Sequence, residues 1–163
     1  MDKVIVIGCP GSGKSTFSKK LHNATGIPIH HLDMMYWNED KTKVPKEIFI
    51  NELNRIINGD KWIIDGNYGS TMEWRIKQCD TVFFLDYPVE VCIEGIKSRR
   101  GQERSDMPWI EKTDEIDKEF LRWVQNYNIE SRPKVIELLE KYNDKNTVVF
   151  KCREEAKEFI GKL

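Results

Sequence analysis

The sequence lacks any long apolar run. None of its 163 residues belongs to an apolar stretch that approaches the ~20 residues needed to span a bilayer. The first residues lead directly into a glycine-rich loop, and no secretory cleavage site separates the two. We therefore expect a cytoplasmic protein that does not associate with membranes.

An excess of basic charge is also missing. The 26 Lys and Arg residues nearly balance the 27 Asp and Glu residues, so the formal net charge is −1. A protein dedicated to duplex DNA usually carries a basic excess or stripe that neutralises the phosphates. The composition therefore does not favour duplex binding, and DNA enters only as a candidate partner through the resemblance described below.

Paired cysteines are the third absence. Cys9, Cys79, Cys92 and Cys152 form no C-x-x-C pair and have no histidine partner near them in the sequence. Such spacing is typical of free thiols in a reducing compartment, and it excludes a disulfide framework or a structural zinc site.

What the chain does contain is a glycine-rich octet, Gly-Cys-Pro-Gly-Ser-Gly-Lys-Ser, at residues 8–15. It matches the Walker A pattern, whose glycines let backbone N–H groups turn inward onto a polyphosphate. Lys14 adds a cation for the terminal phosphates, and the Ser15 hydroxyl can ligate Mg²⁺. We therefore predict binding of ATP with Mg²⁺. The predicted nucleotide-binding residues are Gly8, Pro10, Gly11, Ser12, Gly13, Lys14, Ser15 and Thr16.

Apolar segments alternate with amphipathic ones along the chain, which predicts a parallel sheet covered by helices on both faces. The predicted strands are Lys3–Gly8, Pro28–Leu32, Trp62–Asp65, Thr81–Asp86 and Thr147–Lys151. The predicted helices are Thr16–Ala24, one from about Pro45, Ser70–Gln78, one from Pro88, Glu115–Tyr127, Val135–Tyr142 and Glu154–Ile160. Pro133 should break or kink the chain between the fifth and sixth of these helices.

Two segments fit this pattern poorly, and both follow the carboxyl end of a strand, directly or across a helix. Ligands bind at that edge of open α/β sheets. We assign residues about 34–60 to an acceptor side and the arginine-rich residues about 99–112 to a lid, within a single domain of residues 1–163.

Three aspartates stand at predicted strand ends, where phosphoryl transfer needs carboxylates for the metal's water shell and the acceptor's proton. Asp65 is favoured because Gly66 beside it allows close approach of a ligand. Asp33 is the second candidate. The sequence does not decide which of the two carboxylates serves the metal and which accepts the acceptor's proton. Asp86 has the alternative role of organising the turn into the next helix.

Arginines suit bidentate contacts with phosphate. Arg99 and Arg122, at and beyond the lid, are the candidates for the transferred group. Two interpretations are equally favoured for each of three other arginines: a phosphate contact or a solvated surface charge. These are Arg75, Arg100 and Arg132.

Taken in order, these motifs resemble the adenylate-kinase-like branch of P-loop proteins. More narrowly, they resemble the DNA topology modulation proteins, which are related to adenylate and shikimate kinases. The motifs that carry the narrower resemblance are His31-Leu32-Asp33, Trp62 through Tyr68, Phe84-Leu85-Asp86 and Phe120-Leu121-Arg122-Trp123. It implies a three-layer α/β/α fold with five parallel strands in the order 2-3-1-4-5, ATP with Mg²⁺, and a closing lid.

By the same resemblance Lys14 and Ser15 serve the donor phosphates, Asp65 lies near the metal with Ser15, and Arg99 contacts ATP as the lid begins. Arg122 matches the arginine that faces the transferred phosphate. The chain departs from adenylate kinases at residues 67–69, where Asn-Tyr-Gly replaces Phe-Pro-Arg. AMP is therefore not the expected acceptor, unless Arg75 replaces the missing arginine.

These observations predict an ATP- and Mg²⁺-dependent kinase that phosphorylates a nucleotide-like or other small polar acceptor, with Lys14, Asp33, Asp65, Arg99 and Arg122 as catalytic residues. The alternative is an ATP-binding regulator of DNA topology or gene expression with little or no kinase activity. The sequence identifies neither the acceptor nor the oligomeric state.

Overall fold

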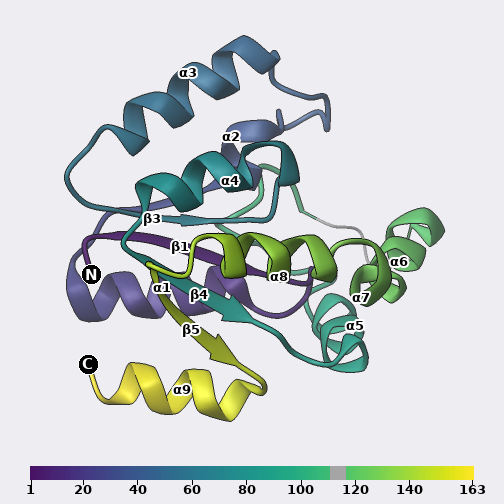
Figure 1. Ribbon diagram of the computed structural model, residues 1–163. Coiled ribbons are helices and arrows are strands. Elements are labelled where there is room, and N and C mark those ends of the chain that lie inside the picture. The colour runs from purple at the N-terminus through teal and green to yellow at the C-terminus, as the bar shows by residue number, and fades with distance from the viewer. Residues whose placement is uncertain (111–116) are drawn as a thin grey trace.

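Five parallel strands form the centre of the molecule in a computed structural model that describes residues 1–110 and 117–163 (Figure 1). The strands are β1 (Lys3–Gly8), β2 (Ile29–His31), β3 (Trp62–Asp65), β4 (Thr81–Leu85) and β5 (Asn146–Phe150). Their order is β2-β3-β1-β4-β5, and every neighbouring pair is parallel. The predicted fold class and strand order are confirmed.

The sheet separates two apolar cores because strand side chains alternate between its faces. Val4 and Val6 of β1 pack into one core, and Ile5 and Ile7 pack into the other. All four side chains are fully buried. A strand that is covered on both faces has to be apolar throughout, which explains the continuous apolar runs in the sequence.

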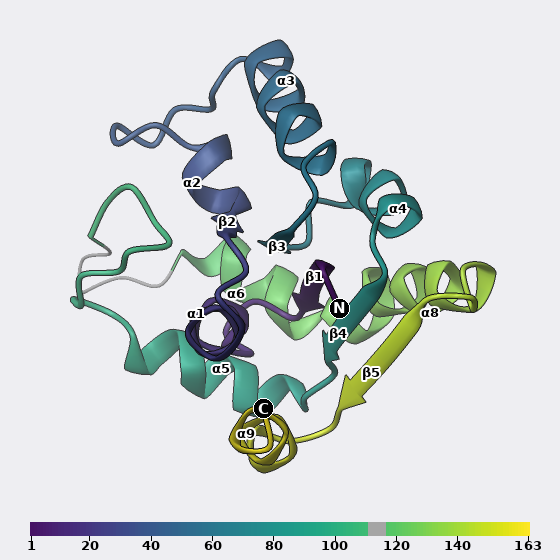
Figure 2. The same cartoon turned by 90° about the vertical axis from the view of Figure 1, so that its left-hand side faces the viewer.

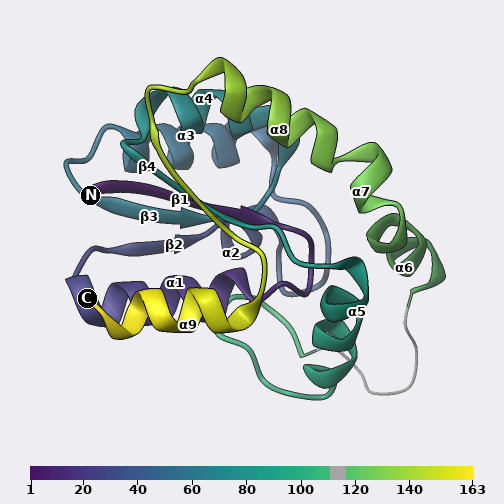
Figure 3. The same cartoon turned by 60° about the horizontal axis from the view of Figure 1, so that its bottom comes forward.

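Helices cover both faces of the sheet. Figure 2 shows the strands in one row between two helical layers, and Figure 3 shows the same layers from another side. One layer contains α1 (Lys14–Thr25) and α9 (Arg153–Gly161), and the other contains α3 (Lys46–Ile57), α4 (Gly69–Gln78) and α8 (Arg132–Lys141). Beyond the end of the sheet lie α5 (Val89–Ser98), α6 (Lys118–Gln125) and α7 (Tyr127–Glu130).

Most predicted boundaries are close to the observed ones. Each strand begins and ends within one residue of its predicted bound. The break near Pro133 is present, but α8 already begins at Arg132, because proline is accommodated in the first helical turn. The predicted helix Glu115–Tyr127 begins outside the described residues, and its described part forms α6 and the start of α7.

In the described part of the chain, the short helix α2 (Leu32–Tyr36) was not predicted. It follows β2 without a loop, in a stretch assigned to a strand end and an irregular segment. It places Asp33 in its first turn.

The described residues include no helix with the length and apolar character needed to span a membrane. All four cysteines are free thiols, as predicted.

Candidate functional site

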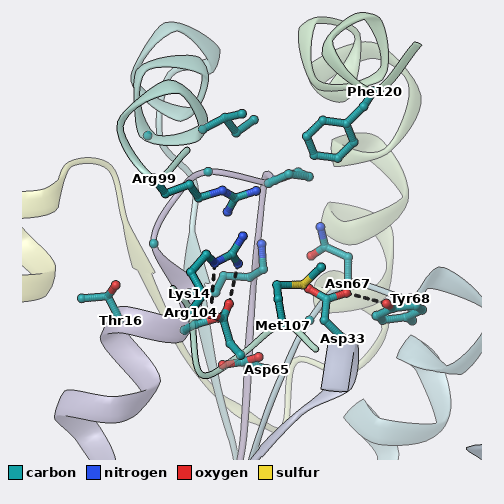
Figure 4. A pocket seen from close by; sticks show the side chains of 18 of the residues that line it. Lys14, Thr16, Asp33, Asp65, Asn67, Tyr68, Arg99, Arg104, Met107 and Phe120 are labelled. Atoms are coloured by element: carbon teal, nitrogen blue, oxygen red, sulfur yellow. Dashed lines mark hydrogen bonds and ion pairs between the residues drawn. The ribbon is translucent and has the colours of Figure 1, made fainter. Parts of the chain in front are cut away.

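A cavity of about 2820 Å³ opens at the carboxyl ends of the strands and extends over the Walker A loop. Its walls come from that loop, α2, the start of α4, residues 98–109 and the helices α5 to α8. Figure 4 shows Lys14, Arg99 and Arg104 gathered near its centre, with Asp65 below them and the Asp33–Tyr68 pair to one side. The fold thus brings residues of the two segments that fitted the strand–helix pattern poorly, about 34–60 and about 99–112, to the wall of one cavity.

The Walker A loop has a backbone that only glycine accommodates at its key positions. Gly11 and Gly13 have φ of 84° and 92°, in the left-handed region. A Cβ on Gly11 would overlap the backbone carbonyl of Cys92, and one on Gly95 would overlap the carbonyl of Gly11. The loop is therefore pressed against α5. Because α1 begins without a side-chain cap, its first N–H groups are available for an anion.

Lys14 rests on the loop that it belongs to. Its Nζ donates to the carbonyl oxygens of Gly8 at 3.0 Å and Cys9 at 3.2 Å. Burial lowers the pKa of Lys14, and the carboxylates of Asp33 and Asp65 oppose that shift. The ammonium is thus held by two backbone carbonyls, and the carboxylates of Asp33 and Asp65 stabilise its charge.

The lid segment reaches the same loop. Ser15 Oγ donates to Asp106 Oδ2 at 2.7 Å, and Arg104 binds the same carboxylate through Nε at 3.1 Å and Nη2 at 2.5 Å. Burial alone would raise the pKa of Asp106, but the hydrogen bonds from Arg104 and Ser15 lower it to about 2. Sequence analysis did not single out Asp106, because an acidic residue in a charged loop is usually solvated.

Asp65 is held by a neighbouring strand. The register of β2 against β3 pairs His31 with Asp65, and His31 Nδ1 lies 2.7 Å from Asp65 Oδ2. Because Asp65 is 4% exposed and its carboxylate binds His31 of β2, the orientation of that carboxylate is fixed by the pairing of two strands.

Asp33 is held by a tyrosine. Tyr68 Oη donates to Asp33 Oδ1 at 2.5 Å. Burial raises the pKa of Asp33 above its ordinary value, although the bond from Tyr68 and the nearby Lys14 partly offset it. A carboxyl with a raised pKa is a stronger base once ionised, which suits proton abstraction from an acceptor hydroxyl.

These groups fit a nucleotide-bound Mg²⁺. Mg²⁺ usually keeps several waters and binds one or two protein oxygens together with substrate phosphates. Ser15 Oγ, Asp33 and Asp65 are hard oxygen donors around the Walker A lysine. No larger cluster of metal-ligating side chains occurs among residues 1–110 and 117–163. These few oxygen donors would hold Mg²⁺ only together with bound phosphates.

Arg75 does not replace the arginine that grips AMP in adenylate kinases, and that suggestion is wrong. Its side chain is fully buried. It donates to the carbonyl oxygens of Gly66 at 3.0 Å, Asn67, and Tyr68 at 3.3 Å, and to the Thr71 hydroxyl. Burial lowers its pKa to about 10. Each nitrogen of the Arg75 guanidinium thus has a partner within the protein, and the side chain shapes the loop after β3.

Asp86 and Arg132 also have structural roles. Arg132 binds Asp86 through two hydrogen bonds of 2.7 and 2.8 Å, and Lys151 contacts the same carboxylate at 2.5 Å. Neither Asp86 nor Arg132 lines the cavity. The pair ties α8 to the end of β4, in keeping with the alternative that Asp86 organises its turn.

The arginines predicted to contact phosphate differ in whether they line the cavity. Arg99 and Arg100 line the cavity. Arg122 is exposed on α6 and is not among the residues that line it, although Lys118 of the same helix is. In this conformation the fold brings Lys14, Asp33, Asp65 and Arg99 together and leaves Arg122 outside.

Aromatic rings connect the acceptor segment with the lid. Trp37 meets Trp109 edge to face at a centroid distance of 5.8 Å, and Lys41 Nζ lies 5.7 Å from the Trp109 ring. Tyr36 packs against Tyr68 at 4.7 Å. A side pocket of about 390 Å³ adjoins this wall and shares Tyr36 and Tyr68 with the main cavity. Aromatic walls of this kind accommodate the apolar face of a small molecule.

Solved structures share this fold. Shikimate kinase from Acinetobacter baumannii in complex with shikimate superposes with a TM-score of 0.59 and 19% identity, covering 99% of this chain and 90% of that one. Shikimate kinase from Bacteroides thetaiotaomicron gives a TM-score of 0.57 and 16% identity, covering 98% of this chain and 94% of that one. No protein-family model and no curated protein sequence matches the chain. The chain thus shares the fold of these two shikimate kinases.

Proposed function

We propose that this protein is an ATP- and Mg²⁺-dependent small-molecule kinase that transfers the γ-phosphoryl group to a hydroxyl of a small polar acceptor. One observation carries the proposal: the Walker A lysine, Lys14, shares its cavity with two carboxylates, the buried Asp65 and the half-buried Asp33. Phosphoryl transfer depends on positioning and charge neutralisation, and this cavity combines a cation, a metal-binding hydroxyl and a base.

The donor side would be held by the loop amides of residues 8–15, by Lys14 and by the Ser15 hydroxyl. Mg²⁺ supplies charge neutralisation on the phosphate oxygens when bound. Asp65, fixed by the hydrogen bond with His31, would hold the metal's water shell. Lys14 exchanges its carbonyl partners for phosphate oxygens, which relieves the unfavourable burial of its charge.

The acceptor side would be organised by Asp33. Its carboxylate accepts the proton of the attacking hydroxyl, and Tyr68 keeps the other side of that carboxylate in place. Tyr36, Trp37 and Trp109 wall this side and exclude water, which limits wasteful hydrolysis of ATP. Arg99, at the centre of the cavity, supplies positive charge near the transferred group.

The test is a transfer assay with γ-labelled ATP and Mg²⁺ against a panel of nucleosides, nucleotides, sugars and shikimate, since a structural neighbour is a shikimate kinase bound to shikimate. Lys14→Ala serves as the matched inactive control. Transfer to one acceptor class, lost in the control, supports the proposal. Absence of transfer to every member of the panel by folded, nucleotide-binding protein contradicts it.

The same preparation tests the regulatory alternative. A regulator of DNA topology requires DNA binding that depends on ATP and survives physiological salt, because non-specific phosphate contacts weaken steeply as salt rises. A filter-binding titration with and without ATP measures this directly.

A further inference from the structure

We infer that Asn67 is a positioning residue that holds the first glycine of the Walker A loop while Lys14 moves from its resting place to the nucleotide phosphates. The inference rests on the proposed function insofar as it requires a nucleotide. It assigns a role to a position at which the chain departs from adenylate kinases.

The carboxamide of Asn67 makes two hydrogen bonds to one residue. Its Oδ1 accepts from the Gly8 N–H at 3.1 Å, and its Nδ2 donates to the Gly8 carbonyl at 2.7 Å. Gly8 begins the loop, 59 residues away in the sequence. A primary amide has a donor and an acceptor side by side, so it matches both polar groups of the glycine.

The Gly8 carbonyl has two donors at rest. Lys14 Nζ lies 3.0 Å from the same oxygen that Asn67 Nδ2 contacts. When a phosphate takes the ammonium, the carbonyl loses one donor. An unpaired, largely buried carbonyl is unfavourable, and Asn67 prevents that outcome because its bond persists. Lys14 can therefore leave without disrupting the start of the loop.

Asn67 is itself held from behind. Arg75, fully buried, binds the backbone carbonyls of Gly66, Asn67 and Tyr68. These hydrogen bonds fix the backbone at residues 66–68 and so keep the Asn67 amide within hydrogen-bonding distance of Gly8. The next residue, Tyr68, donates a hydrogen bond to Asp33. The loop that Arg75 binds therefore orients Gly8 through Asn67 and Asp33 through Tyr68.

The experiment compares Asn67→Leu with Asn51→Leu. Leucine has a similar size but makes neither bond to Gly8, and Asn51 is an exposed residue of α3 that serves as the matched control. Calorimetry with Mg²⁺ and the non-hydrolysable analogue β,γ-imido-ATP measures donor binding. We expect Asn67→Leu to weaken binding about tenfold or more, which corresponds to the loss of about one hydrogen bond, and Asn51→Leu to bind as the wild type does.

A conservative variant separates positioning from general damage. Asn67→Gln keeps a primary amide that can donate and accept, so it should bind the analogue more tightly than Asn67→Leu does. Asn67→Asp keeps an acceptor for the Gly8 N–H but cannot donate to the Gly8 carbonyl, so it should also lose affinity. It serves as the second variant if leucine prevents folding.

The outcomes are distinct. If the wild type binds the analogue and folded Asn67→Leu binds it equally well, or Asn67→Gln loses as much affinity as Asn67→Leu, the inference is wrong while the proposed kinase function stands. If the wild type binds no magnesium–nucleotide at all, both are wrong. If the analogue binds but no acceptor is phosphorylated, only the proposed function is contradicted.

Discussion

The proposed donor side and the proposed acceptor side of the cavity are built in different ways. The proposed donor side consists of eight consecutive residues, 8–15, from the last residue of β1 to the first turn of α1. The proposed acceptor side is assembled from α2 with the segment that follows it, the loop after β3, residues 104–109 and α8. A motif that is local in sequence can be read directly, whereas an assembled wall exists only after folding.

The difference appears in how charged residues are used. In the loop of residues 8–15, Lys14 lines the cavity, where the Walker pattern predicts a cation. Beyond that loop, chemically similar arginines have unrelated roles: Arg75 supports a loop, Arg132 pairs with Asp86, and Arg99 lines the cavity. Residue type therefore predicts a role only where the backbone around it is known.

Removing the donor-side cation should have the largest effect. Lys14→Ala should reduce phosphoryl transfer by at least about 100- to 1,000-fold, because the charge developing on the phosphate loses its nearest cation. Binding of magnesium–ATP should also weaken in calorimetry. Lys20→Ala, on an exposed position of α1, is the matched control. Equal loss in both variants would show that the donor side does not depend on Lys14.

On the acceptor side, Asp33→Asn should reduce transfer by about 100- to 10,000-fold, the usual contribution of a general base. The affinity for magnesium–ATP should stay close to that of the wild type. Asp65→Asn should instead raise the Mg²⁺ concentration needed for half-maximal rate. If the two variants exchange these behaviours, then Asp65 is the base and Asp33 serves the metal.

The loop that joins the two sides depends on Arg75. Arg75→Met should lower the free energy of unfolding by about 3 kcal/mol, because several buried carbonyls lose their donor. Urea denaturation measures the change. Arg55→Met, which removes an exposed pair with Glu52, should change it by less than about 1 kcal/mol. A change as small as this in Arg75→Met would contradict the role given to that side chain.

Tyr68→Phe should have the smallest effect, and it concerns pH. The bond from Tyr68 lowers the pKa of Asp33 against the rise that burial causes, so removing it raises that pKa further. A base with a higher pKa is protonated at higher pH, and the acidic limb of kcat/KM against pH should therefore move to higher pH. An unchanged limb would show that Asp33 is not the group that titrates.

Sequence reasoning located the strands because β-branched and aromatic runs are unambiguous when both faces of a sheet are covered. It missed α2 because a helix of five residues is too short to show a 3.6-residue apolar period, and α2 has no side-chain cap at its start. It missed Asp106 because nothing local shows that a lid carboxylate folds back onto Ser15. It misjudged Arg75, since the three carbonyls that surround the guanidinium meet only in the folded loop.

The amino-acid sequence by itself determined the nucleotide loop and the layered parallel sheet, because each depends on neighbours along the chain: glycine backbone freedom in one case and apolar period in the other. Tertiary structure alone decided which carboxylates, tyrosines and arginines meet around the cavity. Those contacts join residues tens of positions apart, and their geometry follows from strand register and helix packing rather than from any local pattern.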